Sequence, residues 1–210
     1  MSVADRIFAS MYDRMTAGPE KAGLRDHRRR LIPRATGRVL EIGGGTGANL
    51  PFYGTAVQHV TITEPSEPMA KRLEGRLGGQ RFPVELVLAP AEELPFADDS
   101  FDTAVSTLVL CTVVDQAQAL HELRRVLRHD GRLLFIEHVR AEGDRLARWQ
   151  DRLNGVNKIV GRGCNCNRRT LDGIRSAGFT TTELQHDELR KAPPLVRPLV
   201  VGTAELRAAA

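Results

Sequence analysis

The sequence predicts a doubly wound α/β domain built on a mostly parallel sheet. Short apolar segments alternate with helix-like segments along the chain, as expected when helices connect parallel strands. A glycine-rich turn, residues 43–47, directly follows the first apolar segment, at the edge where such sheets bind ligands. The 210 residues are 41% hydrophobic and 27% charged, which is the composition of an ordinary globular domain with one sizeable core.

The individual elements follow from the apolar pattern and from turn residues. Strands are expected at 38–42, 58–63, 84–88, 101–107, 132–138, 179–186 and 195–204. Helices are expected at 5–15, 20–33, 48–53, 67–77, 115–128, 144–160 and 169–177. Asp130-Gly131 predicts a tight turn before the fifth strand.

Composition excludes several classes of protein. No apolar run approaches the roughly 20 residues that span a bilayer, and the first residues lack the apolar core of a secretory signal. Three cysteines, an odd number, argue against a disulfide scaffold and for a reducing compartment, so we expect a cytoplasmic protein.

The net charge of +4 is mild, and much of the basic excess lies early in the chain. No aromatic residues interleave these basic residues, so nucleic acid is not an expected partner. A solvated helix face explains them, and weak contact with an anionic membrane surface is the alternative. The residues concerned are Lys21, Arg25, Arg28, Arg29, Arg30 and Arg34.

The segment VLEIGGGTGANL, residues 39–50, carries four glycines after the first expected strand. Glycine permits positive φ and lets a ligand approach the backbone, although a flexible surface turn is the simpler alternative. Residues 43–48 fit the dinucleotide pattern Gly-x-Gly-x-x-Ala, with Glu64 as the ribose-binding acid that closes the second strand. Residues 41–47, EIGGGTG, match at every position the acid-x-Gly-x-Gly-x-Gly loop that binds S-adenosylmethionine (SAM).

Two longer segments favour the second ligand. Residues 89–113, APAEELPFADDSFDTAVSTLVLCTV, resemble the part of class I SAM-dependent methyltransferases that runs from the adenine loop into the fourth strand. Residues 123–139, LRRVLRHDGRLLFIEHV, resemble the helix, turn and fifth strand that follow. With the glycine loop, the resemblance covers about residues 35–140. Within the class, this chain is similar to the subfamily that includes the quinone-biosynthesis methyltransferases.

Shorter motifs resemble the membrane-associated alkyl thiol methyltransferase-like family of animals. They are AP (89–90), LVLCT (108–112), EH (137–138), GCN (163–165), QH (185–186) and VRP (196–198). The resemblance implies a Rossmann-like, doubly wound sheet of seven strands, mostly parallel with an antiparallel last strand, preceded by N-terminal helices. It also implies SAM as the cofactor and S-adenosylhomocysteine as its product. We expect no N-terminal hydrophobic anchor of the kind these relatives carry.

The loop and the resemblance together indicate which residues bind the cofactor. We expect Glu64 to accept hydrogen bonds from both ribose hydroxyls, and Tyr12, in a Tyr-Asp pair, to act as a lid residue or else to pack on the sheet edge. Pro90 stands where many relatives have aspartate, so backbone and apolar contacts, with Leu94 or Phe96 nearby, should hold adenine. The expected cofactor-binding residues are Tyr12, Glu41, Gly43, Gly44, Gly45, Gly47, Asn49, Glu64, Pro65, Met69, Ala91, Glu92, Leu108 and Val109.

Methyl transfer from a sulfonium needs alignment more than elaborate catalysis, which explains the lack of an obvious triad. His138, at the end of the fifth strand, is the first candidate for a general base, and His186 is the second. The alternative for His138 is that it only forms a hydrogen bond with a segment that covers the site. Cys111 is expected to pack near the methionine tail, with a covalent role as the alternative. Cys164 and Cys166, even with His186, make a poor zinc set, so no metal is expected.

The sequence therefore predicts a SAM-dependent methyltransferase for a small, fairly apolar acceptor: a thiol, a phenol or quinone, or a lipid head group. A SAM-binding regulatory protein without activity and an NAD(P)-dependent oxidoreductase are the alternatives. We expect one domain over 1–210, with a helical cap (1–34), a cofactor-binding core (35–140) and a substrate side (141–210). Trp149 is expected to pack in the core or to line the acceptor pocket.

Overall fold

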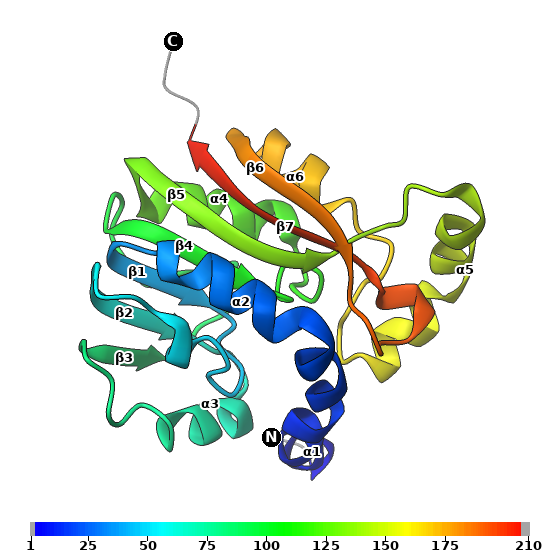
Figure 1. The fold of residues 1–210 in the computed structure, drawn as a ribbon, viewed down its shortest axis with the longest axis horizontal. Coiled ribbons are helices and arrows are strands. Elements are labelled where there is room, and N and C mark those ends of the chain that lie inside the picture. The colour runs from blue at the N-terminus through cyan, green and yellow to red at the C-terminus, as the bar shows by residue number, and fades with distance from the viewer. Residues whose placement is uncertain (1–2, 207–210) are drawn as a thin grey trace.

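The computed structural model describes residues 3–206 and is built on a sheet of seven strands (Figure 1). The order across the sheet is β3-β2-β1-β4-β5-β7-β6. The strands are β1 (Gly37–Ile42), β2 (Val57–Thr63), β3 (Val84–Val87), β4 (Phe101–Thr107), β5 (Leu127–His138), β6 (Phe179–Glu188) and β7 (Pro198–Leu206). The pairs among β1 to β5 are parallel, and β7 is antiparallel to both β5 and β6. The predicted seven-stranded, doubly wound sheet is confirmed.

Helices cover both faces of this sheet. In Figure 1, α2 crosses the near face while α4 and α6 lie behind the strands, and α5 extends beyond the end of the sheet. The helices are α1 (Val3–Pro19), α2 (Arg25–Leu31), α3 (Glu67–Glu74), α4 (Gln116–Val126), α5 (Asp144–Val160) and α6 (Thr170–Ser176). No helix among residues 3–206 is long and apolar enough to cross a membrane.

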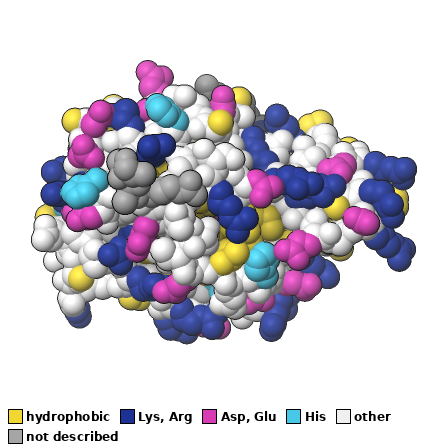
Figure 2. Space-filling model, turned by 90° about the horizontal axis from the view of Figure 1, so that it is seen from above, with side chains coloured by type: hydrophobic (Ala, Val, Ile, Leu, Met, Phe, Trp, Pro, Cys, Tyr) yellow, Lys and Arg dark blue, Asp and Glu magenta, His cyan; other side chains and the backbone are white. Residues whose placement is uncertain are grey.

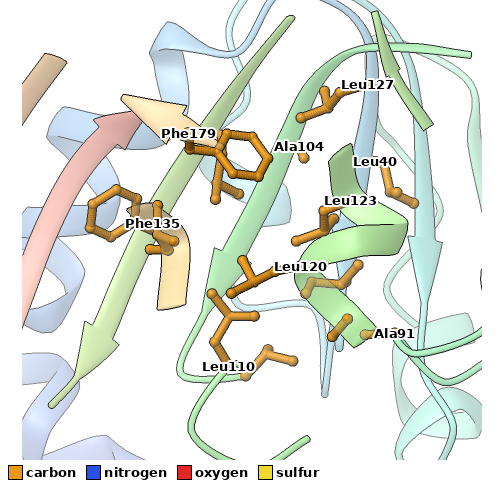
Figure 3. Close-up of a cluster of buried hydrophobic side chains, with 14 of the residues drawn as sticks. Leu40, Ala91, Ala104, Leu110, Leu120, Leu123, Leu127, Phe135 and Phe179 are labelled. Carbon is orange, nitrogen blue, oxygen red and sulfur yellow. The ribbon is translucent and has the colours of Figure 1, made fainter. Parts of the chain in front are cut away.

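The alternation of side chains along the strands divides the core into two layers. On β5, Leu133 and Phe135 pack against α4, whereas Leu134 and Ile136 face the opposite layer. All four are fully buried, as period-2 alternation requires for a strand covered on both faces. Figure 3 shows the first layer, in which Leu120 and Leu123 of α4 lie over β4 and β5.

Four boundaries differ from the prediction. Only a 3-10 turn, Leu50–Phe52, forms where a helix was expected at 48–53, because Pro51 lacks an amide donor. The expected helix at 20–33 is divided by a π-helical turn in which Gly23 has φ 143°. No tight turn precedes β5; the strand begins at Leu127, with a shift in its register against β4. The last strand begins at Pro198, after a separate 3-10 turn, Pro194–Val196.

The basic residues of the first forty positions do not share one environment. Arg29 is a surface residue paired with Asp26, as expected of a solvated face. Arg28 is buried, however, with its guanidinium bonded to Glu20 and Asn49, so the solvated face is the wrong prediction for this residue. On the face of the molecule seen from above, basic and acidic side chains are interspersed (Figure 2).

The strand order places the ends of β1 and β4 side by side at the centre of the sheet. From β1 the chain moves outward to β2 and β3, and from β4 it moves outward in the other direction to β5. The carboxyl ends of these parallel strands share one edge, and the reversal of direction opens a crevice there. The glycine-rich loop and the loop after β4 therefore meet at the position where open α/β sheets bind ligands.

Candidate functional site

The glycine loop between β1 and the 3-10 turn Leu50–Phe52 is held in a conformation that favours glycine. Gly43, Gly45 and Gly47 have φ values of 56°, 58° and 84°. A Cβ on Gly43 would lie 2.7 Å from Val109 Cγ2, and one on Gly47 would lie 2.6 Å from Leu73 Cδ1. These two glycines are thus required by the close approach of neighbouring elements as well as by their φ values.

Gly44 and Gly45 differ in what surrounds them. A Cβ on Gly44, whose φ is not positive, would lie 2.1 Å from Cγ2 of the buried Ile62. A Cβ on Gly45 would meet only Met69 Cε at 3.7 Å and Tyr12 Cε1 at 4.0 Å. Of the four glycines, Gly45 therefore is the one that faces the cleft under α1, and the others are packed against protein.

Glu64, which follows β2, fastens the glycine loop to the next helix. Its carboxylate accepts hydrogen bonds from the amides of Gly45, at 2.8 Å, and Ser66, at 2.9 Å. Burial raises the pKa of Glu64 above its ordinary value of 4.5, and the two amide bonds oppose that shift. Each carboxylate oxygen can accept a second bond, so the side chain retains acceptor capacity toward the cleft.

Glu41 and Asn49 form a buried network beneath the loop. Glu41 accepts hydrogen bonds from Asn49 Nδ2 at 3.0 Å and from the hydroxyl of Tyr53 at 2.7 Å. Arg28 Nη1 donates to Asn49 Oδ1 at 2.6 Å, so a cation from α2 reaches the same network. Glu41 is therefore committed to protein donors and acts on the loop through Asn49.

Helix α1 lies over the glycine loop. Asp13 accepts a 2.7 Å hydrogen bond from Thr46 Oγ1 in the loop and forms ion pairs with Arg72 and Arg76 of the α3 region. Tyr12, one residue earlier, approaches Gly45 from above. The helix is thus fastened to both the loop and α3, with its tyrosine inserted into the cleft.

Two cavities adjoin this region. One of about 130 Å³ is lined in part by Tyr12, Arg28, Thr46 and Leu108. The other, of about 510 Å³, is lined by Phe8, Ser66, Met69, Lys158, Ile159 and Arg162. The larger cavity falls in the size range of small-molecule sites, and apolar side chains supply part of its wall.

The loop after β4 forms the other side of the crevice. Leu108 has φ 58°, a conformation that is uncommon for a residue other than glycine and is concentrated at functional sites. One oxygen of the buried Glu137 accepts from Ser106 Oγ and from the amides of Val109 and Leu110, at 2.7, 3.0 and 3.1 Å. This carboxylate therefore holds the loop after β4 to the end of β5.

The expected adenine-side residues occupy several environments. Ala91 is buried in the core layer under α4, and Pro65 is exposed at the start of the α3 region. Glu92 accepts from the amides of Val114 and Asp115, at 2.6 and 3.2 Å, so it serves the entry to α4. Met69 lies in the wall of the larger cavity.

Comparison with known proteins gives this arrangement its family. Residues 40–135 match the Methyltransferase domain family. The chain is 36% identical over 170 residues to human thiol S-methyltransferase TMT1A. The aligned region covers 79% of this chain and 69% of the relative. This chain is a class I SAM-dependent methyltransferase.

Other relatives agree with that assignment. The ubiquinone/menaquinone biosynthesis C-methyltransferase UbiE of Marinomonas sp. (strain MWYL1) is 30% identical over 175 residues, covering 79% of this chain and 70% of the relative. A SAM-dependent methyltransferase structure from Thermotoga maritima aligns with a TM-score of 0.69 and 26% identity, covering 96% and 97% of the two chains. The predicted enzyme class, small acceptor and SAM cofactor are confirmed.

In this methyltransferase, His138 ends β5 and contacts a cysteine from a distant segment. Its Nε2 lies 2.8 Å from Cys164 Sγ, and Cys111, from the loop after β4, shares a hydrogen bond with Cys164. That bond lowers the pKa of Cys164 and raises the pKa of Cys111, in both cases as the largest cause, while burial raises both. His138 and both cysteines are buried.

The other residues proposed for the acceptor side lie elsewhere. His186, on β6, is about half exposed, with Nδ1 3.6 Å from Glu142 Oε1, and it is not part of the cluster at His138. Its role as a second base stays a prediction. Trp149 is 49% exposed among arginines of α5, so the expectation that it packs in the core is wrong.

Three contributors to the site were not found by sequence reasoning. Arg28 has the pattern of a surface helix residue, and Tyr53 follows the loop without a motif. Asp13 was noted only as half of a Tyr-Asp pair. All three act across distances in sequence that no local spacing rule covers.

The attachment of α1 can be tested at Asp13. We expect Asp13→Ala to weaken the docking of α1 by about 1 kcal/mol. The substitution removes a partly exposed carboxylate that accepts a hydrogen bond from Thr46 and pairs with two arginines. Hydrogen exchange across α1 should speed up about fivefold at that cost, and SAM should dissociate faster. Asp26→Ala, which removes an exposed pair on α2, is the control and should change neither. Unaltered exchange in α1 would contradict the attachment.

Proposed function

We propose that this enzyme transfers the methyl group of SAM to the sulfur of a small, fairly apolar thiol. The observation that carries the proposal is His138, buried at the end of β5 beside the loop that meets the glycine turn. Human TMT1A, named as a thiol S-methyltransferase, supports the same acceptor. The apolar part of the 510 Å³ cavity suits a small hydrophobic substituent.

We propose the following placement of SAM in the crevice. Glu64 accepts hydrogen bonds from the ribose, with Met69 beside the adenosine and Gly45 beneath it. The methionine carboxylate faces Arg28, which lines the smaller cavity together with Leu108. Tyr12 fills the space between these positions, so we expect α1 to shift when SAM binds and then to close over it.

The reaction itself is an in-line displacement. The acceptor sulfur attacks the methyl carbon, and the bond from that carbon to the sulfonium breaks with its electron pair left on S-adenosylhomocysteine. A free thiol has a pKa near ~8.5 and must lose its proton first. We propose that His138 promotes this loss.

A matched set of acceptors tests the function. Purified enzyme is incubated with methyl-labelled SAM and with an aryl thiol, the phenol of the same ring or the corresponding amine. We expect the labelled thioether to be the main product. Faster methylation of the phenol, or of a phosphatidylethanolamine vesicle, would contradict the thiol acceptor. Tight SAM binding with no methylated product from any acceptor would favour a SAM-binding regulatory protein.

The rate acceleration that His138 can provide as a base has an upper limit. At pH 7 about 3% of a free thiol is ionised, so complete ionisation accelerates the reaction by at most about 30-fold. We expect His138→Ala to lower turnover by up to about 30-fold at pH 7 and by little above pH 9, with SAM affinity unchanged. His129→Ala, at an exposed position of the same strand, is the control. Unchanged turnover in His138→Ala at pH 7 would remove this residue from the reaction.

We also propose a cytoplasmic location, supported by the three free cysteines, all of them buried. Weak contact with a membrane surface is supported by α1, where Ile7, Met11 and Met15 recur every four residues and are each about half exposed. Co-sedimentation with anionic vesicles tests that contact, and Met11→Gln should weaken it.

A further inference from the structure

Two cysteines and a histidine converge from three separate segments. Cys111 lies in the loop after β4, His138 ends β5, and Cys164 lies between α5 and α6. One sulfur or nitrogen from each residue lies within 4.8 Å of the corresponding atoms of the other two. Their side chains are buried, at 1%, 4% and 9% exposure, respectively. Such a convergence over more than fifty residues of sequence requires the tertiary fold to hold it.

The backbone around the three side chains is fixed. The amide of Asn165 donates to the Cys111 carbonyl at 2.8 Å, which joins the two cysteine-bearing loops. Asn157 Nδ2 donates to the Cys164 carbonyl, also at 2.8 Å. His138 pairs with Leu199 in the β5–β7 ladder. The three ligand atoms are therefore presented by segments that are held by hydrogen bonds other than those of the cluster.

The surroundings of the cluster favour a cation. Glu137 Oε2 is buried and, among the residues that the structure describes, has no hydrogen-bond partner. A buried carboxylate oxygen without a hydrogen-bond partner is costly, and a nearby cation would offset that cost. Arg168 lies on the other side of the loop that carries Cys111, and its guanidinium donates to the Leu110 and Val114 carbonyls.

The set has the chemistry of a zinc site. Two thiolates and one imidazole suit a borderline-soft ion such as Zn²⁺, whereas Mg²⁺ and Ca²⁺ require oxygen ligands. Tetrahedral zinc with bonds of about 2.3 Å to sulfur and about 2.05 Å to nitrogen places sulfur atoms about 3.8 Å apart and sulfur about 3.5 Å from nitrogen. His138 Nε2 and Cys164 Sγ, now 2.8 Å apart, would need to separate by about 0.7 Å.

We propose that Cys111, His138 and Cys164 bind one Zn²⁺ ion whose fourth position binds the sulfur of the acceptor thiol. Three protein ligands with an open fourth position are the arrangement of catalytic, not structural, zinc sites. Cys111 is two residues after Val109, whose side chain leaves no room for a Cβ on Gly43, so the ion would lie beside the cofactor crevice. The acceptor role rests on the proposed function; the metal site does not.

With His138 bound to zinc, its imidazole nitrogen is not free to accept the proton of the acceptor thiol. Coordination to zinc would then promote ionisation of the thiol in place of His138 acting as a base. The acceptor RSH binds as RS⁻, and its proton passes to solvent. The coordinated sulfur attacks the SAM methyl carbon; a new sulfur–carbon bond forms, and the sulfonium–carbon bond breaks. The resulting thioether is neutral, binds zinc weakly and departs, while the zinc ion keeps its charge throughout.

Cobalt(II) provides a spectroscopic probe of the site that is independent of activity. The purified 210-residue protein is reduced with a phosphine, stripped of metal with a chelator and titrated with CoCl₂. We expect one equivalent to produce the intense visible bands of a tetrahedral site and a near-ultraviolet thiolate-to-cobalt band. Cys111→Ser and Cys164→Ser should each lower the affinity for cobalt at least tenfold. Cys166→Ser is the matched control, because this buried cysteine of the same loop lies outside the cluster.

The outcomes separate the site from the reaction. No stoichiometric cobalt bands, or equal affinity in a Cys111→Ser/Cys164→Ser double variant that still binds SAM, would overturn the metal site. If the bands form, adding the aryl thiol should shift the thiolate-to-cobalt band, and the matched phenol should not. A cobalt site that does not respond to the thiol would overturn the acceptor role. Zinc-bound enzyme that methylates only the phenol would overturn the proposed function while the site stands.

Discussion

Gly44→Ala is expected to destabilise this methyltransferase by about 3 kcal/mol, the upper end of the cost of overpacking a core. The added methyl group would lie 2.1 Å from Ile62 Cγ2 and 3.4 Å from Leu73 Cδ2, both in fully buried side chains. Neither neighbour has open space to enter, so β2 or the loop must shift. For a domain of this size the melting temperature should fall by about 6–12 °C.

Gly45→Ala is the matched comparison in the same loop. Its methyl group meets no atom closer than 3.7 Å, so the cost is mainly that of φ 58° in a residue with a Cβ, about 1–2 kcal/mol. That methyl group projects into the cleft under α1, and SAM affinity should therefore fall more than stability does. The pair is measured by thermal unfolding and by calorimetric titration with SAM. A larger loss of stability in Gly45→Ala than in Gly44→Ala would contradict this account of the loop.

Glu64→Ala is expected to raise the Kd for SAM at least a hundredfold. Two hydrogen bonds from ribose hydroxyls to a carboxylate are each worth about 1.5–3 kcal/mol. The variant also releases the amides of Gly45 and Ser66, which the carboxylate now holds at 2.8 and 2.9 Å. Glu64→Gln keeps the shape of the side chain and should bind SAM with intermediate affinity. Titration with S-adenosylhomocysteine should show the same order, and wild-type affinity in Glu64→Ala would contradict the ribose assignment.

The same carboxylate predicts a pH dependence of SAM binding. Burial raises the pKa of Glu64 above 4.5, so its charged form is lost at a higher pH than for an exposed glutamate. The ribose bonds need that charged form, and SAM affinity should therefore fall as the pH is lowered toward this raised pKa. Glu64→Gln has no proton to gain there and should show a flatter profile. An identical acid limb in both proteins would assign the titration to another group.

Local patterns in the sequence predicted most of this fold. The alternation of Leu133, Leu134, Phe135 and Ile136 between two core layers follows from the period of a strand, and the helices between strands imply parallel pairing. The two clearest errors have different origins. Pro51, a local feature, limited an expected helix to one turn, whereas the Asp130-Gly131 segment became part of β5 in place of the expected tight turn.

The candidate site divides in the same way. The acid-glycine loop, Glu64 after β2 and His138 at the end of β5 are recognisable because strand ends and turn glycines are local features, and the topology of an open sheet brings strand ends to one edge. Cys164 could not be joined to His138 from the sequence, because the two are 26 positions apart and the segment between them contains α5 and a loop without a repeating pattern.

The sequence by itself determined the class of fold and the cofactor. The fold class depends on the alternation of strands and helices along the chain, and the cofactor on the glycine loop together with the resemblance of two longer segments to class I methyltransferases. Only the tertiary structure decided that Gly44 is required by Ile62 and not by a ligand, that Arg28 is buried under the loop, and that two thiols meet one imidazole. These features depend on which distant segments pack together. That packing is determined by the complementarity of whole surfaces, so it cannot be predicted from any single segment of the chain.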